Sequence, residues 1–349
     1  MSGTKERFDN MDGLKAIACL AIVAMHVRAN SGYSLPAGAV TVIASWTNCV
    51  PLFLMLSGFG MFCGYYERCK AGSLNLNAFY ARRYGKILPF FALLIVLDLI
   101  MERSTDHLIE GLMEATLVFG LLPNNQPQVV GVSWTLGVIF LFYMLFSFFV
   151  FLCWTKRRAW ISMAVSILLL ALCSMYYFSD RFVIAGFDPR HSFFYCAPFF
   201  LGGGLAYLHR EFLKTTVAKL RFAVLAVAIG ATVAWYFVPG DDTWVLMMKN
   251  LVVFALWLVY AIGAKSPVLS NRVMKFLAGM SLELYLCHMV FFRILEKLKV
   301  LYIFGKGPAG YVFAFLTVSC VAIAFVTAYK FCVDYIVKRF IRKDAAQDK

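Results

Sequence analysis

The stretch WVLMMKNLVVFALWLVYAIG, residues 244–263, indicates the class of fold. It carries a single charge, on Lys249, and a helix needs an apolar run of about 20 residues to cross about 30 Å of hydrocarbon. The run is uniformly apolar, whereas barrel strands alternate apolar and polar residues, so a helix is favoured. The sequence therefore predicts a transmembrane helix over this stretch.

Similar apolar runs extend the pattern to ten predicted spans. The others lie near 13–29, 42–64, 87–101, 132–153, 159–178, 192–208, 222–238, 277–293 and 310–335. The run near 87–101 is short and can extend back to Phe79. A further run over 111–122 is too short to span and carries Glu114, so it is predicted to be an interfacial or re-entrant segment.

The amino-acid composition is typical of a chain that lies mostly within a lipid bilayer. Hydrophobic residues make up 62% of the 349 residues, charged residues 15%, and the mean hydropathy is +0.76. A soluble domain has about 45–50% apolar and about 25% charged residues, so a soluble fold, disorder, collagen and a disulfide-stapled module are all excluded. The sequence predicts an all-α polytopic membrane protein.

The net charge of +14 is explained by topology rather than by nucleic-acid binding. If the N-terminus is cytoplasmic, most Lys and Arg fall on the cytoplasmic side, as the positive-inside rule requires. We therefore expect about ten transmembrane helices in the cell membrane, with both termini cytoplasmic. Residues 1–349 are expected to form one transmembrane domain with no attached soluble domain, ending in a basic cytoplasmic tail over 336–349.

No motif for a metal, a nucleotide or a redox centre is present. The ten cysteines form no CxxC pair and fall mostly within the predicted spans, which is typical of small buried apolar residues. Walker, GxGxxG and HExxH patterns are missing, and the first apolar run shows no convincing signal-peptide cleavage site. No metal cofactor is predicted.

Ionisable residues inside predicted spans are the best candidates for function, because they are costly in a bilayer. Lys15 and His26 are eleven residues apart on the first predicted helix, so they share one face at a separation of about 16.5 Å along the axis. Lys15 then lies at the cytoplasmic entrance and His26 in the outer half. A hydrogen bond between helices is the simpler interpretation of a lone membrane histidine.

A second histidine belongs to the segment SLELYLCHMVF, residues 281–291. Counting from the start of each span places His288 at about the depth of His26, with Glu283 nearer the cytoplasm. Two histidines at one level can form a proton relay, a metal pair or an acid/base site. The metal pair is the weakest interpretation, because no carboxylate lies at their level with ligand spacing. A histidine can act as general base toward a hydroxyl.

Two further patterns have both a structural and a functional interpretation. Arg82, Arg83 and Lys86 precede an apolar helix, where they can anchor the chain by the positive-inside rule or hold a polyphosphate. Ser57 and Gly58 give a small, close-packing position with a hydroxyl, which suits helix packing or substrate contact equally well.

Taken together, these segments resemble the bacterial acyltransferase-3 family of integral-membrane O-acyltransferases. The resemblance rests on motifs in family order from residue 8 to about 290. These are MDGLKAIACLAIVAMH (11–26), Met55–Gly60 after Pro51, Arg82–Pro89, Ser133–Leu136 with Phe142-Tyr143, Phe199–Gly202 and Gly279–His288. The chain departs from the family at Lys15 and Lys86, where Arg is usual, and at Ile139, where many members carry Glu.

The resemblance implies a function. Family members are thought to take an acyl group, usually acetyl, from cytoplasmic acyl-CoA. They place it on a hydroxyl of a surface glycan, a lipid-linked saccharide or a similar extracytoplasmic acceptor. The resemblance implies that His26 is the general base or a transient acyl carrier, that His288 and Tyr285 complete the site, and that Glu283 is a substitute carboxylate. It implies that Trp134 stacks on a sugar, unless it belongs to the interfacial aromatic belt, and that Asp12 and Gly58 have supporting roles. The residues implied to bind CoA are Lys15, Ser57, Arg82, Arg83 and Lys86.

Two other classes remain open from the sequence alone. A secondary transporter of a sugar or lipid-linked solute also has ten spans and buried ionisable groups, although its two halves are usually related and no matching halves are visible. A non-catalytic membrane module is the second alternative. Some family members carry a fused extracytoplasmic hydrolase-like domain, so a separate extracytoplasmic partner enzyme is a further expectation, along with contacts to membrane lipids.

Overall fold

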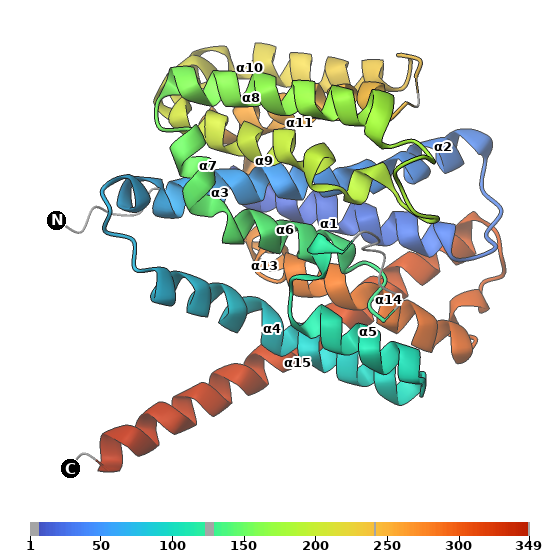
Figure 1. Ribbon diagram of the computed structural model, residues 1–349. Coiled ribbons are helices and arrows are strands. Elements are labelled where there is room, and N and C mark those ends of the chain that lie inside the picture. Colours follow the sequence, from blue (N-terminus) through green and yellow to red (C-terminus); the bar gives the residue numbers. More distant parts are fainter. Residues whose placement is uncertain (1–6, 123–128, 241, 348–349) are drawn as a thin grey trace. The chain divides into compact units, whose positions relative to one another are not determined.

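The computed structural model describes residues 7–122, 129–240 and 242–347, and every regular element in them is a helix (Figure 1). Seven helical segments are long and apolar enough to cross a membrane, or up to nine if each of two bent helix pairs counts as one span. The chain is therefore a multi-pass, all-helical membrane protein, as predicted. The seven segments are Asn10–Ala29, Ala37–Lys70, Leu76–Met101, Lys156–Tyr177, Arg210–Trp235, Thr243–Gly263 and Pro308–Ile336.

The bent pairs occur where the sequence showed one unbroken apolar run. Helix α6 (Trp134–Met144) and helix α7 (Phe146–Leu152) meet at an angle of 62°. Helix α13 (Arg272–Ala278) and helix α14 (Ser281–Lys297) form the second pair. Apolar content predicts that a segment is in the membrane, but it does not show whether the helix is straight.

The span predicted near 192–208 is short. Helix α9 (Phe193–Leu208) has 16 residues, which corresponds to about 24 Å. Its side chains are largely buried, and it packs against α3 (Val50–Lys70) and α8 (Lys156–Leu172). A helix surrounded by protein need not match the thickness of the hydrocarbon, which explains why the expected ten spans exceed the seven to nine in the structure.

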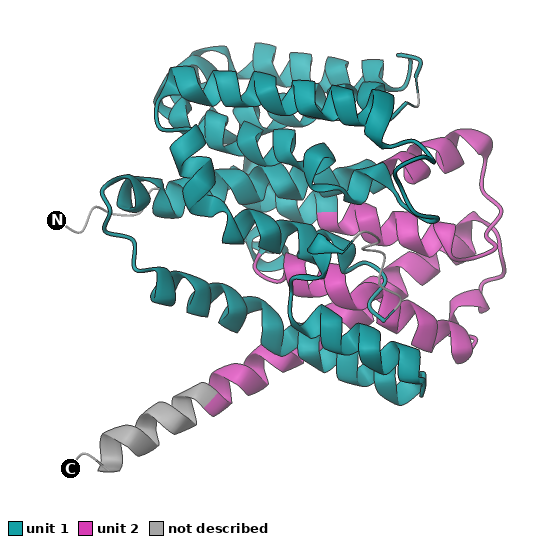
Figure 2. Ribbon diagram, viewed as in Figure 1, with its two compact units in different colours: residues 1–18, 47–278 teal, residues 19–46, 279–349 magenta. Residues whose placement is uncertain are grey.

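The chain divides into two compact units, coloured separately in Figure 2. Unit 1 comprises residues 1–18 and 47–278, and unit 2 comprises residues 19–46 and 279–349. Helix α1 (Asn10–Ala29) runs without interruption through the boundary and so contributes residues to both. Unit 1 also contains α3, α6 to α9 and α13, together with α4 (Leu76–Met101), α5 (Thr105–Ala115), α10 (Arg210–Trp235), α11 (Thr243–Gly263) and α12 (Pro267–Ser270).

Unit 1 is built on the close approach of α3 and α9. A Cβ atom on Gly58 would clash with the Phe200 carbonyl oxygen, and one on Gly203 would clash with the Met55 carbonyl oxygen. The two helices therefore touch through their backbones, as small residues allow in membrane proteins. Phe142 of α6 stacks on Phe200 with ring centroids 4.7 Å apart, which adds aromatic packing beside this contact.

Polar side chains set where several of these helices begin. Asn75 accepts a hydrogen bond from the Ala78 amide at 2.9 Å at the start of α4. Thr155 and Ser192 cap α8 and α9 in the same way, each through its hydroxyl. An Asn, Ser or Thr in this position satisfies an amide that has no partner within the helix.

Helix α5 occupies part of the segment predicted to be interfacial or re-entrant, and it is not among the candidate spans. It docks through Glu114, which is only 1% exposed and accepts a hydrogen bond from the Val130 amide at 3.3 Å. Its second carboxylate oxygen has no hydrogen-bond partner in the part of the chain that the structure describes. Burial raises the pKa of Glu114 to about 8.

Unit 2 packs the second half of α1 with α2 (Ala37–Ser45), α14 and α15 (Pro308–Gln347). Tyr311 of α15 donates a hydrogen bond to the Ala24 carbonyl of α1 at 3.0 Å. The hydroxyl of Tyr33 donates to the Leu301 carbonyl. The Tyr311 hydrogen bond thus joins α15 to α1 two residues from His26, and the Tyr33 hydrogen bond fixes the segment that follows α1.

Candidate active site

The two membrane histidines lie next to each other in unit 2. His26 of α1 and His288 of α14 have ring centroids 5.1 Å apart, with ring planes at 49°. His26 is half-buried, whereas His288 is fully buried, with an exposed fraction of 0%. The structure therefore brings together the two imidazoles that the sequence placed at one depth, and it leaves only His26 accessible to a substrate.

Hydrogen bonding settles which nitrogen of neutral His288 is basic. Its Nδ1 lies 2.6 Å from the backbone carbonyl oxygen of Tyr285, and a carbonyl only accepts, so Nδ1 carries the proton and donates. Nε2 then carries the lone pair, and it is buried without a partner among the residues that the structure describes. Tyr285 was predicted to shape the site, and it contacts His288 through its backbone.

Glu283, in the first turn of α14, is occupied by an ion pair. Its Oε1 lies 3.0 Å from Nζ of Lys330 on α15, and Lys330 also donates to the Gly279 carbonyl. Its side chain is 13% exposed. The sequence suggested Glu283 as a catalytic carboxylate and Lys330 as a snorkelling residue. Their pairing ties α14 to α15 within unit 2.

Arg83 lies in an aromatic box in unit 1. Its guanidinium carbon is 5.0 Å from the ring centroid of Tyr65, 5.6 Å from Phe79 and 4.9 Å from Tyr143. These distances allow cation–π contact with all three rings. Its Nε is buried and has no hydrogen-bond partner within the described chain. Stacking thus holds Arg83, and the Nε–H of its planar guanidinium remains available to donate a hydrogen bond to an anion.

The aromatic box is continuous with Ser57. The hydroxyls of Ser57 and Tyr143 are 3.0 Å apart, so α3, α4 and α6 contribute to one cluster of Ser57, Tyr143 and Arg83. The two other predicted basic residues of the motif, Arg82 and Lys86, are both exposed. The structure therefore connects two of the five predicted cofactor-binding residues, Ser57 and Arg83, through Tyr143. Arg82 and Lys86 lie on the same helix as Arg83, whereas Lys15 lies on α1.

Lys15 is half-buried in unit 1 and forms no hydrogen bond or ion pair with the described residues. Asp12, which was expected to orient Lys15, acts on it through its charge and also binds Nη2 of Arg7 at 3.3 Å. Gly13, two residues before Lys15, packs closely against α12, because a Cβ atom on it would clash with the backbone of Leu269. The Lys15 ammonium, which no carboxylate of the described chain holds in an ion pair, is suited to bind an anionic ligand.

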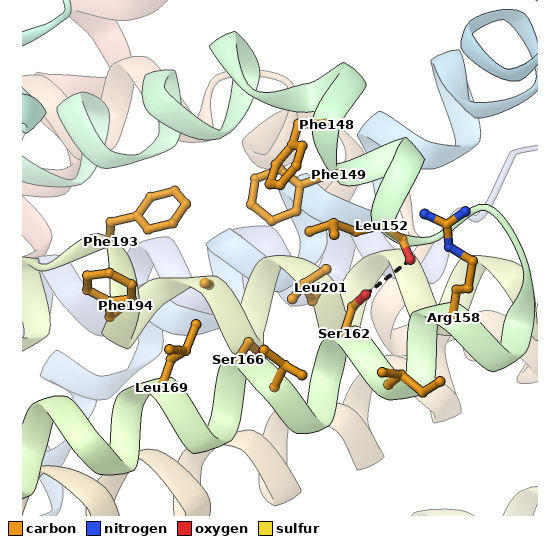
Figure 3. A pocket seen from close by; sticks show the side chains of 13 residues that line it. Phe148, Phe149, Leu152, Arg158, Ser162, Ser166, Leu169, Phe193, Phe194 and Leu201 are labelled. Carbon is orange, nitrogen blue, oxygen red and sulfur yellow. Dashed lines mark hydrogen bonds between the residues drawn. The ribbon is translucent and has the colours of Figure 1, made fainter.

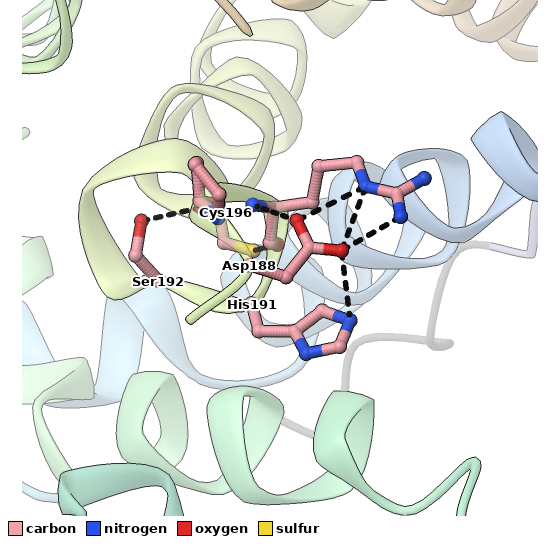
Figure 4. A network of polar contacts seen from close by, with 6 residues as sticks. Asp188, His191, Ser192 and Cys196 are labelled. Atoms are coloured by element: carbon pink, nitrogen blue, oxygen red, sulfur yellow. Dashed lines mark hydrogen bonds and ion pairs between the residues drawn. The ribbon is translucent and has the colours of Figure 1, made fainter. Parts of the chain in front are cut away.

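Trp134 begins α6 and stacks on His191 in unit 1. The ring centroids are 3.8 Å apart and the planes are at 19°. Figure 4 shows His191 next to Asp188, whose carboxylate also binds the Arg190 guanidinium at 2.7 Å. Burial opposes ionisation of Asp188, but the hydrogen bonds and charge of Arg190 outweigh it and lower the pKa of that carboxyl. His191 covers one face of the indole, so a sugar could stack only on the other face.

The sequence reasoning missed the aromatic residues that hold Arg83, and it missed the His191 stack. A signal for the first existed: Phe79 precedes Arg83 by four residues on one helix, so the two share a face. Tyr65 comes from a different helix, and His191 lies in the short 3₁₀ turn Pro189–His191, so no periodicity connects them to their partners. Such contacts depend on tertiary packing.

Comparison with known families identifies the class of protein. The sequence model of acyltransferase 3, described as an acyltransferase domain, matches residues 8–329. The chain therefore belongs to the acyltransferase 3 family and is a membrane acyltransferase. Comparisons with curated proteins and with solved structures found no match.

Family membership has a direct consequence for the open alternatives. It favours an enzyme over a secondary transporter or a non-catalytic module, and it implies an acyl donor and an acyl acceptor. The described residues contain no group of three or more His, Cys, Asp or Glu side chains arranged to hold a metal ion. The histidine pair and the Arg83 cluster are the two constellations that can serve acyl transfer.

Proposed function

We propose that this enzyme transfers an acyl group, acetyl by default, from acyl-CoA to a hydroxyl of an extracytoplasmic glycan or lipid-linked saccharide. The observation that supports this most strongly is the His26–His288 pair, with ring centroids 5.1 Å apart and one accessible imidazole. A general base is what a sugar hydroxyl needs before it can attack a thioester.

The chemistry follows from the position of each imidazole. His26 removes the proton of the acceptor hydroxyl, and the oxygen forms a bond to the thioester carbonyl carbon. The carbon–sulfur bond then breaks, and the thiolate of CoA takes the proton back from His26. His288 does not contact the substrate. Its buried Nε2 has no hydrogen-bond partner among the described residues, and in the proposed mechanism this lone pair accepts a hydrogen bond from the nearby His26 ring and so orients the base, as a buried acceptor does in serine hydrolases.

The acyl donor is proposed to bind the cations of unit 1. Neither Lys15 nor Arg83 forms an ion pair with a carboxylate within the described chain, and Arg83 is held at its position by the rings of Tyr65 and Tyr143. The phosphates of CoA are the anions that match them, with the exposed Arg82 and Lys86 adding charge. Because α1 is one continuous helix, it carries both Lys15 and His26 on one face.

The proposed topology places the donor side in the cytoplasm. Lys156, Arg157 and Arg158, the Arg82–Lys86 segment and the basic residues over 336–349 then all lie on the cytoplasmic side, which satisfies the positive-inside rule. Acyl-CoA is supplied in the cytoplasm, and the half of α1 with His26 lies toward the other side. A separate extracytoplasmic enzyme could take the acyl group onward.

The proposal is tested with inside-out membrane vesicles and acetyl-CoA labelled on the acetyl group. We expect label to appear in an ester of the glycan fraction, with release of free CoA in equal amount. Arg83→Ala should raise the KM for acetyl-CoA about 10-fold or more through loss of a charge-assisted contact, whereas Arg221→Ala, at an exposed arginine outside the cluster, should not. Uptake of a solute without any need for acetyl-CoA would contradict the proposal.

A trapped covalent species separates the two routes open to His26. If His26 carries the acyl group itself, rapid quenching with acetyl-CoA alone should yield one acetyl group per enzyme on a peptide containing residue 26. The general-base route predicts no label on that peptide and full turnover when acceptor is present. Either result leaves His26 as the residue that contacts the reacting atoms.

A further inference from the structure

An apolar pocket lies within unit 1, and none of the residues that line it belongs to the Arg83 cluster. It is formed by α7, α8 and α9 and has a volume of about 370 Å³ (Figure 3). Phe148, Phe149 and Leu152 of α7 and the neighbouring parts of α8 and α9 line it. The volume lies within the range of pockets that hold small ligands, about 300–1,000 Å³.

The polar groups of the pocket wall are already used. The Ser162 hydroxyl donates to the Leu152 carbonyl at 3.1 Å, and the Ser166 hydroxyl donates to the Met163 carbonyl at 2.9 Å. Neither hydroxyl therefore needs a polar ligand. The pocket presents hydrocarbon and aromatic surface over most of its length, which favours an apolar chain over a sugar or a nucleotide.

One edge of the pocket is formed by exposed side chains of a candidate membrane-spanning segment. Ile161, Val165 and Leu169 of α8 line it and are 53%, 47% and 41% exposed. They lie within Lys156–Tyr177, one of the seven candidate spans. Exposed aliphatic side chains on such a helix contact lipid chains, so a lipid chain has direct access to the pocket.

One end of the pocket carries a cation. Figure 3 shows Arg158 at the end opposite Phe193 and Phe194. Its guanidinium packs over the Phe151 ring at 4.3 Å and forms no ion pair with a carboxylate in the described part of the chain. Lys156 and Arg157 precede it in the first turn of α8, so the local charge is positive. An apolar slot that ends at an unpaired arginine matches a molecule with a hydrocarbon chain and an anionic head.

We propose that this pocket binds one acyl chain of an anionic phospholipid, with the lipid phosphate on Arg158. The chain lies between α7, α8 and α9, and the headgroup phosphate lies against Arg158, the residue of the first turn of α8 that lines the pocket. Such a lipid fills the space between the bent α6–α7 pair and the α8–α9 pair and stabilises that arrangement. The assignment is independent of the acyl-transfer chemistry, since none of its residues belongs to the histidine pair or the Arg83 cluster.

The test uses native mass spectrometry of the whole chain from mixed micelles that contain phosphatidylglycerol or phosphatidylcholine with identical chains. The wild type should retain one phosphatidylglycerol and at least about fivefold less phosphatidylcholine. Arg158→Gln should abolish this preference, whereas Arg157→Gln, one position away and outside the pocket lining, should keep it.

Ala197→Phe gives an independent arm, because Ala197 lines the pocket and its side chain can be enlarged into it. This variant should lose both lipids while leaving Arg158 in place. Equal retention of the two lipids by the wild type, equal effects of the Arg157 and Arg158 variants, or unchanged retention by Ala197→Phe would each overturn the assignment. A melting curve of each variant in detergent shows whether it is folded.

Discussion

His288 is the residue whose proposed role is most clearly fixed by local geometry. Its Nδ1 donates to the Tyr285 carbonyl, so a substitution that removes Nε2 removes the acceptor that orients His26. His288→Asn should lower kcat about 10- to 100-fold while leaving the KM for acetyl-CoA unchanged, because donor binding depends on unit 1. Steady-state kinetics in vesicles measures both parameters.

The control for His288 is another histidine with a hydrogen-bonded ring. His209 lies where α9 meets α10 and accepts a hydrogen bond from the Trp160 indole at 3.2 Å. His209→Asn should leave kcat within about twofold of the wild type. If His288→Asn raised KM and lowered stability with kcat intact, His288 would be a packing residue only.

Glu114 predicts how stability depends on pH. Burial raises its pKa from 4.5 to about 8, so the folded state holds a proton that the unfolded state has lost. The contribution of the protonated carboxyl is fully present below about pH 4.5 and is lost as the pH rises through about 8. Glu114→Gln mimics the protonated form and should therefore be about 1–3 kcal/mol more stable than the wild type near pH 9.

Thermal unfolding in detergent at a series of pH values between 5 and 9 measures this effect. The two curves of melting temperature against pH should lie close together near pH 5, diverge progressively as the pH rises, and stop diverging above about pH 8. Asp106→Asn removes a carboxylate at an exposed position of the same helix and is the matched control, so it should not reproduce this divergence. Curves for Glu114→Gln and wild type that stay parallel over the whole range would show that Glu114 does not titrate as described.

At the scale of elements, the α3–α9 contact depends on Gly58. A Cβ atom there has no room against the Phe200 carbonyl oxygen, and backbone cannot move as a flexible side chain can. Gly58→Ala should lower stability by about 1–3 kcal/mol. Gly60 is the matched control, because a Cβ on it meets nothing within 4 Å and it lies on the same helix.

Gly60→Ala should leave stability unchanged or raise it by up to about 1 kcal/mol, since Ala favours a helix over Gly. Denaturation of the purified variants in detergent compares the two substitutions directly. Equal stability of the Gly58 and Gly60 variants would show that α3 and α9 do not depend on backbone contact at this position.

The elements also show how far the sequence could go. Apolar runs predicted the spans over residues 244–263 and 310–335 well, because length and hydropathy alone define a membrane helix. The short run near 192–208 was also predicted with nearly the bounds of α9, but the break between α6 and α7 was not visible, since it depends on what surrounds the helix. The histidine pair was predicted from depth along two helices. The Glu283–Lys330 pair was not, because each residue was interpreted alone.

For the whole molecule, the proposed function divides between the two compact units. Unit 1 contains Lys15 and Arg83, the cations proposed to bind the acyl donor, and unit 2 contains the half-buried His26 and the buried His288. Helix α1 carries residues of both units, so Lys15 and His26 belong to one continuous helix.

The most direct measurement compares donor binding and acyl transfer for His26→Ala. The variant should bind CoA within about twofold of the wild type, because the cations of unit 1 are unchanged. It should transfer labelled acetyl at least about 100-fold more slowly, because the acceptor hydroxyl has lost its base. Transfer by His26→Ala at the wild-type rate would contradict the proposed role of the histidine pair.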